Sequence, residues 1–159
     1  MFEYGDLDPE EAALLALEHV RATARWLAQA AHDDVVDDET ARVFGTAAEV
    51  THDFARELEL VLEERVDATV PQPTDLITRL HRPPDLLTFT DDGPEVSPQD
   101  LFEIACTEQE EAYEFFLGEA DGLDDPWLKA VFEEITRHTR GVLLYLEEQR
   151  EALIDREGA

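Results

Sequence analysis

The chain has 159 residues and carries 12 basic against 40 acidic side chains, which gives a net charge of −28. This length suits a single domain, 1–159, with a hydrophobic core of its own. A surface this negative repels phosphate, so nucleic acid and anionic lipid are not expected as partners. Cys106 is the one cysteine, which excludes an internal disulfide and a thiolate zinc site.

The apolar runs are short, as in 12–17, so no membrane span is predicted. The acidic start MFEYGDLDPE lacks the basic region of a secretory signal, and we expect a cytoplasmic protein. Eleven of the twelve basic residues are arginine and one is Lys129, and this bias together with the strong acidity resembles proteins of salt-adapted organisms. Molar salt shortens the Debye length to about 3 Å and screens such repulsion. We therefore interpret the charge as halophilic adaptation.

Apolar spacing predicts four helices and almost no strand, over 9–31, 38–66, 98–120 and 126–155. Three of these helices have a proline-led start, in which a capping residue directly precedes proline: Asp8-Pro9, Ser97-Pro98 and Asp125-Pro126. Such starts are typical of helix N-termini, because proline lacks the N–H that the first turn leaves without a partner.

The lengths of the joins predict how the helices are connected. The short joins 32–37 and 121–125 favour two antiparallel helical hairpins. The proline-rich segment 67–97 is long enough to be a crossover that returns the chain to the starting end of a bundle. The predicted fold class is all-α, a four-helix bundle of two antiparallel hairpins joined by one long crossover.

The stretch 100–116, with the sequence Asp-Leu-Phe-Glu-Ile-Ala-Cys-Thr-Glu-Gln-Glu-Glu-Ala-Tyr-Glu-Phe-Phe, resembles a known family. It is similar to the third helix, ending Ala-Tyr-Glu-Phe-Tyr, of the rubrerythrin-related branch of the ferritin-like superfamily. The hairpins also read as an internal repeat, with Ala22 and Trp26 matching Ala112 and Phe116. The resemblance covers the four helices and omits the crossover. It implies a ferritin-like bundle around two irons, held by a Glu from each of two helices and a Glu-x-x-His from each of the others.

One segment, Glu49-Val-Thr-His52, matches Glu-x-x-His in helix 38–66. At 100° per residue, Glu49 falls opposite the apolar face of this helix. His52 lies about 120° from the centre of that face by the same geometry. We therefore predict that this motif faces solvent.

The resemblance assigns the six ligand positions of the family to other residues of this chain, namely His19, Thr51, Phe54, Gln109, Thr139 and Val142. This set lacks the carboxylates that two irons need. Phe54 and Val142 are expected to fill the centre with hydrocarbon, because unpaired inward carboxylates are costly to bury. Thr51, Gln109 and Thr139 are predicted to form a small polar cluster at the bundle centre, because buried polar groups seek partners.

A metal site would require rotated helices and a different ligand set, built from some of His19, Glu49, His52, Glu108, Glu134 and His138. The simpler interpretation of His19 and His138 is a histidine hydrogen-bonded to a neighbouring helix. No phosphate loop, nucleophile elbow or HExxH motif offers other catalytic chemistry.

The resemblance with these substitutions favours a ferritin-like, rubrerythrin-related protein of a halophile with a metal-free centre. We expect it to act as a non-enzymatic structural or interaction module, with a homodimer through a helical face as one form. The alternative is a diiron oxidoreductase or iron-binding protein that handles peroxide or oxygen. A third hypothesis, a carrier of a small ligand, needs a cavity near Thr51 and Thr139.

Overall fold

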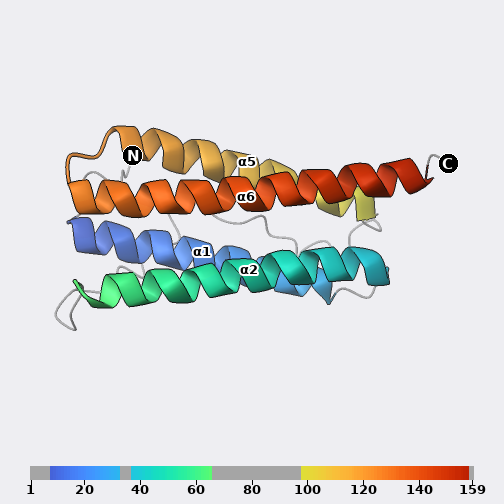
Figure 1. Cartoon of the computed structure of the whole chain (residues 1–159), viewed down its shortest axis with the longest axis horizontal. Coiled ribbons are helices and arrows are strands. Elements are labelled where there is room, and N and C mark those ends of the chain that lie inside the picture. Colours follow the sequence, from blue (N-terminus) through green and yellow to red (C-terminus); the bar gives the residue numbers. More distant parts are fainter. Residues whose placement is uncertain (1–7, 33–36, 66–97, 158–159) are drawn as a thin grey trace, which may run out of the picture.

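The computed structural model describes residues 8–32, 37–65 and 98–157 (Figure 1). Its elements are four helices: α1 (Pro9–Ala31), α2 (Asp38–Glu63), α5 (Pro98–Asp121) and α6 (Pro126–Glu157). Within these ranges the chain contains no strand. The four helices begin where the sequence predicts, but α2 ends at 63 rather than 66, α5 at 121 rather than 120 and α6 at 157 rather than 155. The predicted crossover, 67–97, lies outside the described residues.

Each helix packs mainly against the one that shares its short join, α1 on α2 and α5 on α6, and both pairs are antiparallel (Figure 1). The predicted hairpins are therefore present. Helices α2 and α5 run in the same direction, opposite to α1 and α6. Aromatic contacts agree, because Phe44 near the start of α2 lies 5.1 Å from Phe102 near the start of α5, measured between ring centroids. The arrangement is compatible with the predicted four-helix bundle.

Two buried hydrophobic clusters hold the hairpins together, and each draws residues from all four helices. The first includes Leu17, Leu62, Phe116 and Phe132, and the second includes Leu27, Phe44, Phe102 and Leu146. Burial of each such side chain stabilises the fold by roughly 1.5–3 kcal/mol. The apolar faces predicted from the sequence therefore supply the main attraction between the hairpins.

Aspartate caps begin two of the helices. The Asp37 carboxylate accepts a hydrogen bond from the Thr40 N–H at 2.7 Å, and Asp125 accepts one from the Leu128 N–H at 2.8 Å. Asp8 occupies the N-cap position of α1, but its side chain makes no capping hydrogen bond. The predicted N-cap position is therefore confirmed, and Asp8 joins the helix through its carbonyl, which accepts from the Ala12 N–H. Ser97 lies outside the described residues.

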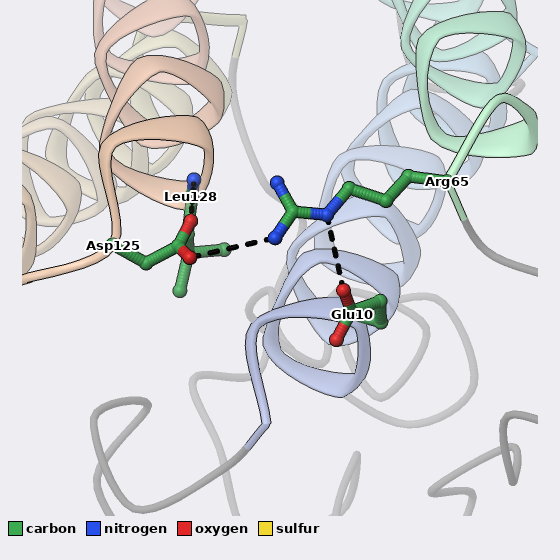
Figure 2. A network of polar contacts seen from close by, with 4 residues as sticks. All are labelled: Glu10, Arg65, Asp125 and Leu128. Atoms are coloured by element: carbon green, nitrogen blue, oxygen red, sulfur yellow. Dashed lines mark hydrogen bonds and ion pairs between the residues drawn. The ribbon is translucent and has the colours of Figure 1, made fainter.

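Arg65, just beyond the end of α2, connects three helices at one end of the molecule (Figure 2). Its Nε donates to a Glu10 carboxylate oxygen at 3.1 Å, and its Nη2 lies 3.4 Å from an Asp125 oxygen. The guanidinium carbon also lies 4.3 Å from the centroid of the Trp127 ring. Arg65 thus joins the end of α2 to the starts of α1 and α6.

In the described part of the chain, no helix is long and apolar enough to cross a membrane.

Candidate functional site

The six positions that the resemblance assigns to metal ligands come from all four helices. Four of them are buried: Thr51, Gln109, Thr139 and Val142. His19 and Phe54 are half-buried. Burial at all six positions follows from the helical phase, because each lies on or beside the apolar stripe of its helix. The centre of the molecule is therefore built from hydroxyl, amide, imidazole and hydrocarbon groups.

His138 of α6 occupies the seam between α2 and α6. Its Nε2 shares a hydrogen bond of 3.2 Å with the Thr51 hydroxyl oxygen. Its ring stacks on Phe54, with centroids 4.2 Å apart and planes within 9° of parallel. Burial lowers the pKa of His138 to about 4, so the ring is neutral at neutral pH. His138 is therefore a histidine hydrogen-bonded to a neighbouring helix, as the simpler interpretation of the sequence predicts.

The three residues of the predicted polar cluster are all buried, and Thr51 and Gln109 are only 2% and 4% exposed. The hydrogen bonds of the two threonines do not join the cluster: Thr51 pairs with His138, while the Thr139 hydroxyl donates to the Ile135 carbonyl at 2.8 Å. Threonine in a helix can satisfy its hydroxyl on the carbonyl four residues back. Thr139 therefore needs no partner on another helix.

The residues of the alternative metal site lie in different places. Glu49 and His52 are exposed, as the helical phase predicts, and Glu134 is exposed and pairs with Arg137. Glu108 is half-buried, and the half-buried ring of His19 lies 5.2 Å from that of Phe116. Across residues 8–32, 37–65 and 98–157, no three His, Cys, Asp or Glu side chains gather in a group that could hold a metal ion.

The residues at the centre do not fit two irons. In the described ranges, the buried polar side chains are four threonines and one glutamine: Thr40, Thr51, Gln109, Thr136 and Thr139. Iron pairs in bundles need several anionic oxygen ligands. The half-buried His19 is the one imidazole at the six ligand positions, and no carboxylate accompanies it there.

Cys106 is not a nucleophile of this centre. The thiol is buried, and burial raises its pKa to about 11. Because the thiolate is the reactive form, the side chain stays protonated and inert near neutral pH. Cys106 is a small hydrophobic residue of the second cluster.

Two surface grooves were not predicted. One, of about 520 Å³, lies between α1 and α2, with alanines on its floor and arginines on its rim. The other, of about 340 Å³, lies between α2 and α6 and includes Val50, His138, Gly141 and Tyr145. The signal for the first groove was present in the sequence as alanines at helical spacing, Ala24 with Ala28 and Ala48 with Ala55.

Comparison with known proteins gives no relative: the chain matches no protein-family model, no curated protein and no solved structure. The features that define its class are therefore those of the molecule itself. They are four helices in two antiparallel hairpins around a centre whose buried polar groups, within the described ranges, carry no charge.

Proposed function

We propose that this chain is a rubrerythrin-related, ferritin-like protein of a salt-adapted organism in which a packed core has replaced the dinuclear iron centre. In this proposal it acts as a non-enzymatic structural or interaction module. The order of helix directions supports the relation, because α2 ends at the opposite end of the molecule from the start of α5. Ferritin-like bundles have one such long connection.

The observation that carries the proposal is the identity of the inward residues on α2 and α6. At the four positions where the family would place two Glu and two His, this chain has Thr51, Phe54, Thr139 and Val142. Phe54 stacks on His138, and Val142 belongs to the second hydrophobic cluster. In this proposal these side chains stabilise the centre by packing and by hydrogen bonds in place of metal.

The proposed surface for a partner lies on α2 and α6. Val50 is 50% exposed beside the α2–α6 groove, and Leu144 is 53% exposed one turn along α6 from Gly141, which lines the same groove. A contiguous exposed apolar surface is typical of an interaction site. A second copy of the chain is the proposed partner, and light scattering in solution would then give twice the mass of one chain.

The test of the metal-free centre is iron analysis of protein produced with added iron and purified in high salt. We expect far less than one iron per chain, before and after anaerobic incubation with Fe(II). About two irons per chain would overturn the proposal in favour of the diiron alternative. E49Q/H52Q would then be analysed beside the wild type, since loss of iron in this variant would locate the metal at the solvent-facing motif.

A further inference from the structure

The groove between α1 and α2 has the size and lining of a small-molecule site. Its volume of about 520 Å³ falls within the range of roughly 300–1,000 Å³ that is usual for ligand pockets. Among the described residues, those that line it all belong to α1 and α2. Ala24, Ala48 and Ala55 are buried on its floor, where their short side chains leave room that longer ones would fill.

The rim of this groove carries a net positive charge, opposite in sign to the net charge of the whole chain. Arg21 and Arg25, the two cations of α1, both line it, together with Arg56 of α2. Two carboxylates, Glu49 and Glu59, lie among these three guanidinium groups. The lining therefore carries an excess of positive charge in a chain whose net charge is −28.

The three arginines differ in their partners. Arg21 is held by Glu18 at 2.6 Å and by Glu59 at 3.0 Å. Arg25 and Arg56 are exposed, and neither forms an ion pair with any residue of the described ranges. A guanidinium group binds carboxylate or phosphate through two parallel hydrogen bonds. Two such groups, one on each helix, thus remain available for an anion beside an apolar floor.

We propose that the α1–α2 groove binds an organic anion with an apolar body. Its carboxylate or phosphate group contacts Arg25 and Arg56, and its hydrocarbon part lies on the alanine floor. The apolar body is essential, because the field of the whole molecule repels small anions. Each methylene buried on the floor strengthens binding about fourfold. This inference does not depend on whether the centre of the bundle holds metal.

The test uses octanoate and octyl phosphate as probes, titrated calorimetrically into the full chain. We expect one saturable site, with acetate and inorganic phosphate binding at least about tenfold more weakly because they lack the apolar body. The preference between the two octyl probes identifies the anionic group. R25Q/R56Q should weaken binding of the preferred probe by about tenfold or more, through loss of both charge-assisted contacts.

The matched control is R42Q/R140Q, which makes the same change of charge at two exposed arginines outside the groove. Its affinity should stay within about twofold of the wild type, since exposed charges at a distance are screened. An equal loss in both double variants, or no loss in R25Q/R56Q, would overturn the proposal. So would the absence of saturable binding of both octyl probes.

Two further variants, A28L and E49Q, test the groove even if circular dichroism shows that R25Q/R56Q is unfolded. A28L places a longer side chain on the floor and should weaken binding of the octyl probes. E49Q removes a carboxylate from the rim and should tighten binding about two- to fivefold. Unchanged affinity in both would reject the site. If R25Q/R56Q is folded, a mass in light scattering that falls from dimer to monomer would reject the site too, by assigning the groove to a second copy.

Discussion

The contact between His138 and Thr51 shows how a residue that resembles a metal ligand can serve packing instead. The imidazole is neutral, stacked on Phe54 and hydrogen-bonded to the Thr51 hydroxyl. A buried polar group without its partner destabilises a fold by about 1–3 kcal/mol. The pair therefore fixes the register of α6 against α2, and each residue depends on the other.

Thr51→Val removes the hydroxyl but keeps the shape of the side chain. We expect it to lower the free energy of unfolding by about 1–3 kcal/mol, because His138 loses its partner. Thr136→Val is the control, since the buried Thr136 hydroxyl donates only to the Phe132 carbonyl of its own helix, and its loss should change stability by less than about 1 kcal/mol. Urea denaturation measures both. Equal effects would show that the contact with His138 does not contribute.

The lowered pKa of His138 makes stability depend on pH. The unfolded chain takes up a proton near pH 6.5, whereas the folded chain resists protonation until about pH 4. The contribution of the neutral His138 to the free energy of unfolding is therefore fully present above pH 6.5. It is lost as the pH falls toward 4, which lowers the free energy of unfolding by up to about 3 kcal/mol.

His138→Gln removes this titration and leaves the carboxylates unchanged, so the difference from the wild type isolates the histidine. We expect the difference in unfolding free energy, measured in urea at a series of pH values, to shift in favour of the variant between pH 6.5 and 4. Parallel curves for the two proteins would contradict this assignment.

At the scale of the helix, starts and ends follow different rules. The starts, predicted at about 9, 38, 98 and 126, agree with the observed ones, and a proline at the first position marks three of them locally. The end of α2 was predicted three residues too late, since neither glycine nor proline follows Glu63 to stop the helix. The chain leaves the helix where Arg65 reaches Glu10 and Asp125, contacts that depend on the neighbouring helices.

The caps give a test of these starts. Asp37→Ala and Asp125→Ala should each lower the free energy of unfolding by about 1 kcal/mol, because each carboxylate accepts a hydrogen bond from a first-turn N–H. Asp8→Ala should lower it by only a few tenths of a kcal/mol, since that side chain makes no capping bond and acts only through the helix dipole. Denaturation in urea distinguishes them. A loss at Asp8 as large as at Asp37 would contradict the observed caps.

At the scale of the molecule, charge opposes folding and hydrophobic burial favours it. A net charge of −28 on 159 residues produces self-repulsion that salt can screen. The exposed ion pairs of Arg65 and Arg21 recover little of this energy, because such pairs contribute about 0–1 kcal/mol each. Adaptation to high salt stays a prediction from composition.

We expect the melting temperature to rise steeply with potassium chloride between low and molar concentrations, because screening removes repulsion from the compact state. Circular dichroism during heating measures it. Sucrose is the control, since it favours burial without screening charge. A melting temperature that sucrose raises and potassium chloride leaves unchanged would refute the electrostatic explanation.

The sequence alone determined the all-helical class, the helix starts, the hairpins and the outward phase of Glu49 and His52, because helix signals are local and periodicity fixes which face of a helix is apolar. The tertiary structure decided which side chains meet. The stacking of Phe54 on His138 and the joining of three helices by Arg65 depend on the axial and rotational register of helices distant in the chain. The arginine-rimmed groove likewise exists only where two alanine faces lie side by side, a relation that neither helix encodes alone.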